Sequence, residues 1–219
     1  MCSSDLTGVH LGSYGRDLEP RTSLASLLRA LDAEFGASAE AGAPAVRFRV
    51  SSLEPMDCTP DVLTLMRDSA CLAPHFHLPL QHASGRMLEA MRRPYDLAYY
   101  AALVDAIRRD IPHASIGTDV IVGFPGEQDE DFAELEHYLE GAPLTHVHVF
   151  PYSDRPGTAA SRLGNRPDGV TIKARGARLR AVSARLQQRF LRSQLGTVHR
   201  ALTLEDGTLA VTGNYLKLR

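Results

Sequence analysis

Residues 115–124 read SIGTDVIVGF, and residues 145–150 read THVHVF. Both are short apolar runs rich in β-branched residues, which is typical of buried strands. Between them, residues 129–139 carry apolar side chains at helical spacing and begin with three acidic residues, so this segment predicts a helix. A strand, a helix and a second strand in this order predict two parallel strands joined by a crossover helix.

The same alternation continues in both directions from this unit. Strands are expected at 5–11, 45–53 and 75–80 (broken by Pro79), and helices at 23–35 (ending at Gly36), 61–67, 84–93 and 96–109. Thr59 is the expected N-cap of the helix at 61–67. On the C-terminal side, an Arg-rich helix is expected at 171–193, followed by short strands with hairpin turns at 205–207 and 212–214. Five strand–helix units suit part of a (β/α) barrel or an open α/β sheet, because a complete eight-fold barrel typically needs about 250 residues.

Composition excludes several classes of protein. The chain has 219 residues, is 44% hydrophobic, and contains no apolar run long enough for a membrane span. It shows no secretory signal, and its three cysteines are too few for a disulfide framework. These features predict a globular cytoplasmic protein with no membrane partner.

Charge is distributed unevenly along the chain. Residues 1–150 hold 11 Lys and Arg against 22 Asp and Glu, whereas residues 151–219 hold 13 against 4. On the expected helix 171–193, four arginines share one face and Leu179, Val182, Leu186 and Phe190 share another. Two interpretations stay open: a solvated helix face, or contact with a polyanion such as RNA through Arg178, Arg185, Arg189 and Arg192.

The strand ends are the expected place for a ligand, because reactive residues of parallel α/β folds lie at the carboxyl ends of strands. The loop from Gly123 to Glu127 lacks the Lys of a phosphate-binding loop, and the acidic first turn that follows would repel an anion. A neutral or cationic ligand is therefore expected there, and a sulfonium satisfies that condition.

Two His-x-His pairs offer an alternative. His75 with His77, and His146 with His148, each share one face of an expected strand, and Asp119 could add a carboxylate. Such a set would suit a metal-dependent barrel hydrolase. The competing interpretation is partly buried histidines with backbone hydrogen bonds, and no third ligand at a fixed spacing supports a metal site.

Five motifs in order resemble one family. They are LTGVHLGSYG at 6–15, RVSSLEP at 49–55, HLPLQHAS at 77–84, DVIVGFPGE at 119–127, and HVFPYS at 148–153. Together they resemble the radical S-adenosylmethionine (SAM) methylthiotransferases. Residues 212–216, TGNYL, look like the opening of a TRAM domain, a small RNA-binding β module.

The resemblance implies an α/β fold, an incomplete (β/α) partial TIM barrel of the radical SAM type at 1–194 and a truncated TRAM-like antiparallel β domain at 195–219. It implies insertion of a methylthio group into a C–H bond, with SAM and [4Fe–4S] clusters as cofactors. The Cys-x-x-x-Cys-x-x-Cys motif that holds the radical cluster in this family is absent, so we expect an N- and C-terminally truncated fragment that is inactive alone. Implied partners are tRNA and an electron donor such as flavodoxin or ferredoxin, and a monomer is expected.

The resemblance also places a SAM-binding rim on this sequence, without assigning a catalytic residue or a metal ligand. Gly8 and His10 would lie near the amino group of the methionine moiety. Ser51, Glu54 and Gln81 would meet the ribose or carboxylate. The adenine would pack on Ile121, Val122 and Gly123.

Within the family, residues 9–15 and 148–153 look most like the branch acting on threonylcarbamoyladenosine in tRNA. The segment QHAS at 81–84 leans instead toward the branch that modifies a ribosomal protein. A tRNA-binding module without chemistry, served by the basic helix and tail, is a further alternative.

Overall fold

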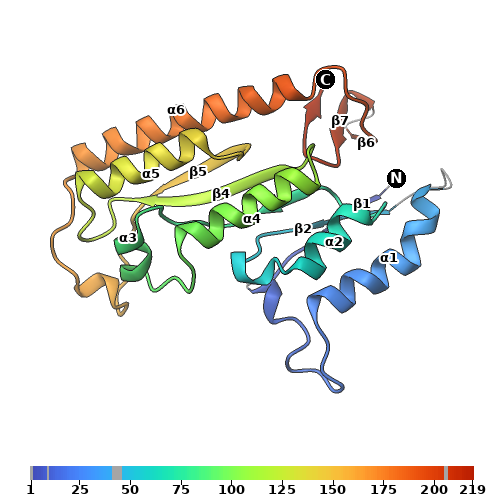
Figure 1. Cartoon of the computed structure of the whole chain (residues 1–219), viewed down its shortest axis with the longest axis horizontal. Helices are drawn as coiled ribbons and strands as arrows, with labels where there is room; N and C mark the ends of the chain where they lie inside the picture. The colour runs from blue at the N-terminus through green and yellow to red at the C-terminus, as the bar shows by residue number, and fades with distance from the viewer. Residues whose placement is uncertain (1, 9, 41–45, 205–206) are drawn as a thin grey trace. The chain divides into compact units, whose positions relative to one another are not determined.

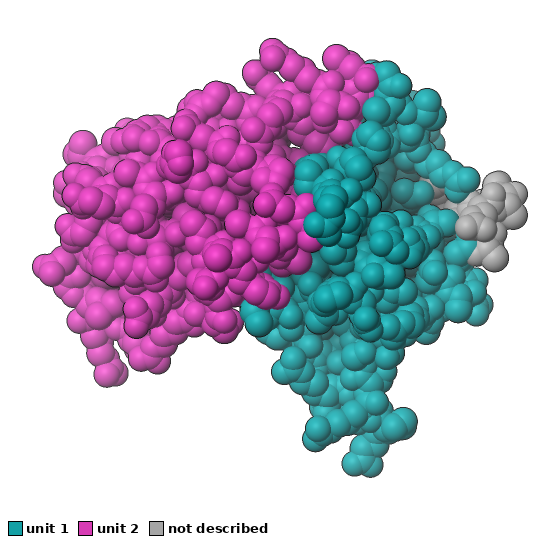
Figure 2. Space-filling view, viewed as in Figure 1, with its two compact units in different colours: residues 1–77, 107–115, 196–219 teal, residues 78–106, 116–195 magenta. Residues whose placement is uncertain are grey.

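The computed structural model describes residues 2–8, 10–40, 46–204 and 207–219, and, of these, all side chains except those of 2–5 and 37–40. The chain divides into two compact units (Figure 2). Unit 1 comprises residues 1–77, 107–115 and 196–219, and unit 2 comprises residues 78–106 and 116–195. Helices alternate with parallel strands (Figure 1), which confirms the expected α/β class.

Unit 1 is built around two parallel strands. Strand β1 (Cys2–Leu6) pairs with β2 (Val46–Val50), and Leu6 is in register with Val50. Helices α1 (Leu24–Glu40) and α2 (Pro60–Asp68) follow the two strands, and Thr59 caps α2 as expected. Phe48 packs edge-on against Phe35 of α1, with ring centroids 5.3 Å apart. Short 3₁₀ turns η1 (Leu11–Ser13) and η2 (Pro55–Asp57) lie beyond the strand ends.

Two expectations for unit 1 are corrected. The first strand lies at Cys2–Leu6 instead of 5–11, because Leu11–Ser13 form a 3₁₀ turn, in which the Ser13 hydroxyl donates to the His10 carbonyl at 2.7 Å. Val9 lies outside the described residues. Helix α1 does not stop at Gly36 but continues to Glu40, since the following Ala-Ser-Ala-Glu run sustains a helix. Strand β3 (His75–His77) ends before Pro79, in agreement with the expected break there, because Pro79 has no N–H for a ladder.

Unit 2 contains the strand–helix–strand motif on which the fold prediction rests. Strand β4 (Ser115–Val122) runs parallel to β5 (His146–Pro151), in the register Asp119 with His148 and Val122 with Pro151. Helix α5 (Asp129–Gly141) connects them. Helices α3 (Gly85–Ala90) and α4 (Leu97–Asp110) precede β4, and Tyr100 of α4 donates to the Leu78 carbonyl at 2.8 Å. The core of the unit is aliphatic, with Ile116, Val120, Leu135 and Leu139 fully buried.

Helix α6 (Gly169–Ser193) confirms the long amphipathic helix and begins two residues earlier than expected. Asp168 is its N-cap and accepts hydrogen bonds from the N–H groups of Val170 and Thr171. The apolar stripe identified in the sequence is buried, and α6 lies alongside α5 and β5 (Figure 1). A short 3₁₀ turn, η3 (Ala160–Arg162), lies in the loop between β5 and α6.

The C-terminal segment of unit 1 forms an antiparallel sheet of β6 (Ala201–Leu204), β7 (Leu209–Thr212) and β8 (Lys217–Leu218). The turn expected at 212–214 is confirmed, with Tyr215 N–H donating to the Thr212 carbonyl at 3.0 Å. In the other expected turn, Glu205 and Asp206 lie outside the described residues. Among the described helices, none combines the length and apolar character needed to cross a bilayer.

Candidate functional site

Four of the expected rim residues follow the ends of β1 and β2 in unit 1. Because these strands are parallel, Gly8 and His10 leave the sheet at the same edge as Ser51 and Glu54. The Ser51 N–H donates to the Leu6 carbonyl at 2.9 Å, which extends the ladder by one residue. The half-exposed His10 ring lies near Asp57, with Nε2 and Oδ2 3.6 Å apart. Gly8 is exposed, and Ser51 and Glu54 are half-buried.

His77, a member of the first His-x-His pair, is the last residue of the neighbouring strand β3. The His77 carbonyl accepts from the Leu53 N–H at 3.0 Å, and His77 Nδ1 lies 2.6 Å from the Ser52 hydroxyl. His75 instead packs edge-on against Tyr215, with ring centroids 5.5 Å apart. The two members of this pair therefore have different neighbours.

The other four rim residues gather at the end of β4 in unit 2. Gln81 lies beside β4, its N–H donating to the Asp119 carbonyl and its carbonyl accepting from Ile121 N–H, both at 2.8 Å. Its φ of +70° is in the left-handed region, which costs energy for a residue with a side chain. Such conformations persist where surrounding contacts enforce them, and they cluster at ligand sites. No pattern in the sequence indicates this backbone conformation.

The adjacent residues on which the adenine is expected to pack differ in solvent accessibility. Ile121 is half-buried, whereas Val122 is buried, so the Val122 side chain belongs to the core of the unit. Gly123 has a φ of +78°, and a Cβ there would lie 2.5 Å from Ile172 of α6. Both the backbone conformation and the close approach of α6 therefore require glycine at this position.

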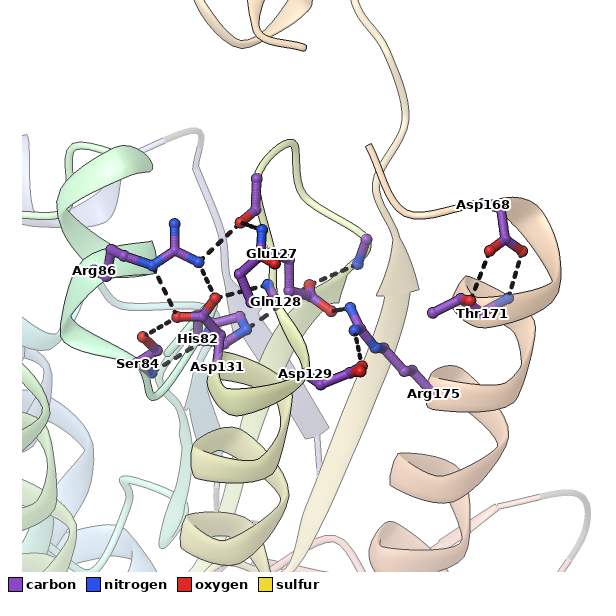
Figure 3. A network of polar contacts seen from close by, with 12 residues as sticks. His82, Ser84, Arg86, Glu127, Gln128, Asp129, Asp131, Asp168, Thr171 and Arg175 are labelled. Carbon is purple, nitrogen blue, oxygen red and sulfur yellow. Dashed lines mark hydrogen bonds and ion pairs between the residues drawn. The ribbon is translucent and has the colours of Figure 1, made fainter. Parts of the chain in front are cut away.

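Glu127 occupies the centre of a buried polar network beside this rim (Figure 3). Its Oε2 accepts the Gly123 N–H at 2.7 Å, and its Oε1 accepts from Arg175 of α6 at 2.5 Å. The Glu127 side chain is fully buried and that of Arg175 is 7% exposed. Arg175 also pairs with Asp129 at 2.6 Å. Burial raises the pKa of Glu127, although the hydrogen bonds from Gly123 and Arg175 oppose that rise.

A second carboxylate, Asp131, joins α3 to the beginning of α5. It accepts from the Ser84 hydroxyl and from the Gln128 N–H, each at 2.7 Å, and it forms an ion pair with Arg86. Burial acts to raise the pKa of Asp131, but the hydrogen bonds, led by that from the Gln128 N–H, outweigh it and lower the pKa. Arg86 also donates to the Gly126 carbonyl at 2.8 Å, so α3 holds the loop between β4 and α5.

His82 lies fully buried between these two carboxylates (Figure 3). Its Nδ1 accepts the Ser84 N–H at 3.0 Å, so the neutral ring carries its proton on Nε2. Nε2 lies 3.8 Å from Glu127 Oε2 and makes no hydrogen bond in the described part of the chain. Burial lowers the pKa of His82 to about 4. The ring is therefore neutral at physiological pH.

The sequence pointed to the loop from Gly123 to Glu127 but not to the inward orientation of Glu127. Arg175 was not among the four arginines assigned to one face of its helix, and the structure turns it into the unit. The second His-x-His pair lies on β5, where the rings of His146 and His148 are 5.1 Å apart. Asp119 is in register with His148.

The arginines expected to contact RNA lie on α6, against α5. Arg178 pairs with Glu136 at 2.9 Å and Arg185 with Glu140 at 2.7 Å, while Arg189 donates to the Ala142 carbonyl. Arg192 is exposed near the end of α6. The acidic helix α5 thus balances much of the charge of this face.

The sequence profile of the radical SAM superfamily matches residues 8–139, which is more than half of the chain. The chain therefore belongs to the radical SAM superfamily. It is 37% identical over 98% of its length to the threonylcarbamoyladenosine tRNA methylthiotransferase MtaB of Aquifex aeolicus, and it covers 50% of that protein. It is 36% identical over 87% of its length to a tRNA-2-methylthio-N(6)-dimethylallyladenosine synthase of Streptomyces avermitilis, and it covers 36% of that protein. The chain thus spans half or less of these relatives.

Among solved structures, coproporphyrinogen III oxidase of Escherichia coli, a radical SAM enzyme, aligns with 78% of this chain and 40% of its own. The TM-score of that alignment is 0.48 and the sequence identity is 16%.

Proposed function

We propose that this chain is the SAM-binding part of a tRNA methylthiotransferase that acts on threonylcarbamoyladenosine next to the anticodon. The observation that carries the proposal is the 37% identity over 98% of the chain to a relative named for that nucleoside. Because the chain spans half of that relative, the activity, the substrate and the tRNA partner are all inferred from the whole protein.

SAM would be held by the strand ends already described. The resemblance assigns this role to Gly8, His10, Ser51, Glu54, Gln81, Ile121, Val122 and Gly123. The half-exposed Gln81 side chain, fixed by its left-handed backbone, fits a hydrogen-bonding role. Val122 would act through its backbone, because its side chain is buried. When bound, SAM and the cluster that reduces it supply the radical chemistry of the superfamily.

The described cysteines do not fit an iron–sulfur cluster. Cys58 is buried, and burial raises the pKa of its thiol to about 12. Cys71 is fully buried, and its Sγ lies 3.8 Å from the Leu31 carbonyl oxygen. Cluster ligands are thiolates, so neither residue is suited to that role. Neither Cys58 nor Cys71 is therefore a candidate cluster ligand.

Contact with tRNA through α6 is part of the proposal. For Arg178 and Arg185, a phosphate would compete with Glu136 and Glu140, whereas Arg192 lies exposed at the far end of the helix. Arg189 would have to leave the Ala142 carbonyl. Contact between α6 and tRNA would therefore begin at Arg192. The electron donor, a flavodoxin or a ferredoxin, is inferred from the family alone.

The test is the modified-nucleoside content of tRNA from the organism that encodes the chain, with and without its gene, measured by liquid chromatography and mass spectrometry. We expect deletion to convert methylthiolated threonylcarbamoyladenosine to the form that lacks the methylthio group. An unchanged nucleoside profile would contradict the proposal. Loss of the methylthio group from dimethylallyladenosine instead would contradict the chosen substrate.

A further inference from the structure

A cavity of about 450 Å³ lies in unit 2, where helices α4 and α5 line it. Its volume is in the range of small-ligand sites. The lining residues of α4 are spaced four positions apart and therefore share one face of the helix: Leu97, Ala101 and Asp105. Those of α5 also share one face: Glu134, His137, Tyr138 and Gly141.

The charged side chains that line the cavity are acidic. Asp105 and Glu134 each present a carboxylate at an exposed position, and no Lys or Arg is among the described lining residues. In the described part of the chain, neither carboxylate forms an ion pair or a side-chain hydrogen bond. A hollow lined by one sign of charge attracts ligands of the opposite sign. A ligand of this cavity is therefore expected to be a cation.

The Tyr138 hydroxyl is a second, independent indication of a ligand. Its oxygen is buried and has no hydrogen-bond partner in the described part of the chain. Burial, and then the Asp105 carboxylate, raise the pKa of Tyr138, so the hydroxyl stays protonated at physiological pH. A buried hydroxyl without a partner destabilises a fold, and most buried hydroxyls in proteins are hydrogen-bonded. A ligand in the cavity that Tyr138 lines would supply the missing partner.

The rest of the lining suits an alkyl chain. It is apolar or small: Leu97, Ala101, Gly141, Ala142 and Pro143. Burying methylene groups against such side chains is favourable. The Tyr138 ring, whose centroid lies 6.3 Å from that of Tyr100 of α4, adds an aromatic surface that attracts ammonium groups.

A single metal ion fits these groups poorly. Among the described residues, Asp105, Glu134 and His137 do not form a group of three ligand atoms that all lie within 4.8 Å of one another. The two carboxylates also belong to different helices. Two positive charges joined by an alkyl chain therefore match the lining better than one point charge does.

We propose that this cavity binds a small aliphatic diamine. One ammonium group pairs with Asp105 and donates to the Tyr138 hydroxyl, and the second pairs with Glu134, each through charge-assisted hydrogen bonds. The alkyl chain between them covers the apolar lining. The site uses none of the residues assigned to SAM and does not rest on the proposed methylthiolation.

The experiment is isothermal titration calorimetry of the whole chain at low salt with cadaverine, a diamine, and with pentylamine, which has the same chain length and one amine. We expect cadaverine to bind about tenfold more tightly, which is the contribution of one further charge-assisted hydrogen bond. Glu134→Gln should weaken cadaverine binding about tenfold. Glu89→Gln, at an exposed position of α3 outside the cavity, is the matched control and should leave affinity within about twofold.

Tyr138→Phe distinguishes a ligand contact from a role in the fold. The variant removes a hydroxyl that has no partner in the described part of the chain, so the melting temperature should be kept or raised while cadaverine binding weakens. Unchanged cadaverine affinity in Tyr138→Phe would overturn the proposal. A failure of cadaverine to bind, or equal losses in Glu134→Gln and Glu89→Gln, would overturn it as well.

Discussion

Glu127 illustrates how one buried carboxylate organises a loop. It accepts the Gly123 N–H from one side and pairs with Arg175 of α6 from the other, so it fixes both the left-handed glycine and the beginning of α6. Removing one partner of a buried ion pair leaves the other charge buried without compensation. This destabilises the fold more than replacing both partners by apolar residues does.

Glu127→Gln should therefore lower the free energy of unfolding by about 3 kcal/mol. The Arg175 charge would stay buried, and among the described residues its remaining ion-pair partner would be Asp129, which is exposed. Urea unfolding followed by circular dichroism measures this. Glu136→Gln is the control: its partner Arg178 is 57% exposed, so the cost should stay below about 1 kcal/mol. Equal costs for the two variants would contradict a buried network.

His82 gives the structure a pH dependence. Its pKa is about 4 in the folded chain, whereas an unfolded histidine titrates near 6.5, so the unfolded state takes up a proton first as pH falls. The contribution of neutral His82 to the free energy of unfolding is therefore fully present above pH ~6.5 and is lost as pH falls toward 4. The full loss is about 3 kcal/mol.

Replacement His82→Asn keeps an acceptor for the Ser84 N–H and removes the titrating ring. Between pH 7 and pH ~4.5, the urea midpoint should fall less in this variant than in the wild type. The reason is that the variant lacks the ring that takes up a proton on unfolding. His137→Asn, at an exposed position of α5, is the matched control and should retain the wild-type profile. Identical profiles for wild type and His82→Asn would refute a buried neutral His82.

The sequence predicted which loops follow the strand ends, because strand ends can be read from periodicity and from Gly and Pro residues. It did not predict that Glu127 turns inward or that Gln81 adopts a left-handed backbone. Both depend on partners 48 and 38 positions away, namely Arg175 and Asp119. Periodicity carries no information about such distant pairings.

At the scale of elements, side-chain hydroxyls complete the backbone hydrogen bonding of the strands. The Ser183 hydroxyl of α6 accepts the Val147 N–H at 2.9 Å and donates to the Val147 carbonyl at 3.0 Å. The Thr145 hydroxyl bonds the N–H and carbonyl of Ile116 in the same way, at 3.1 and 3.0 Å. These contacts satisfy both backbone groups of Val147 and the N–H of Ile116, whereas the Ile116 carbonyl also accepts the Thr145 backbone N–H at 2.8 Å.

Ser183→Ala should expose this role. Both backbone groups of Val147 would lose their partner at the covered side of β5, so we expect about 2 kcal/mol less stability. Hydrogen exchange should show faster exchange at the Val147 amide. Ser193→Ala removes the hydroxyl's bonds to the Phe190 carbonyl and the Gln194 side chain at the end of α6; it is the control and should leave that amide protected. Unchanged exchange in Ser183→Ala would contradict the contact.

The element predictions succeeded where the physics is local. The stripe of α6 and the cap of α2 follow from neighbouring residues and are confirmed. The error at Gly36 is also informative, because a single glycine costs a helix only about 1 kcal/mol and does not have to end it. The pairing of α6 arginines with α5 carboxylates was not predictable, since it depends on how two helices pack.

At the scale of the whole molecule, part of the charge asymmetry along the sequence is balanced between two helices. Arg178 and Arg185 of α6 pair with Glu136 and Glu140 of α5. Part of the excess of Lys and Arg after residue 150 therefore has a structural use.

The central claim is that strand ends of this fold bind SAM, and equilibrium dialysis of the chain against labelled SAM tests it most directly. We predict that the chain binds SAM and that Gln81→Asn, which tolerates a left-handed backbone but shortens the amide's reach, weakens binding roughly fivefold. Gln187→Asn, on the exposed face of α6, should have no effect. The absence of SAM binding, or equal affinity in wild type and Gln81→Asn, would contradict the claim.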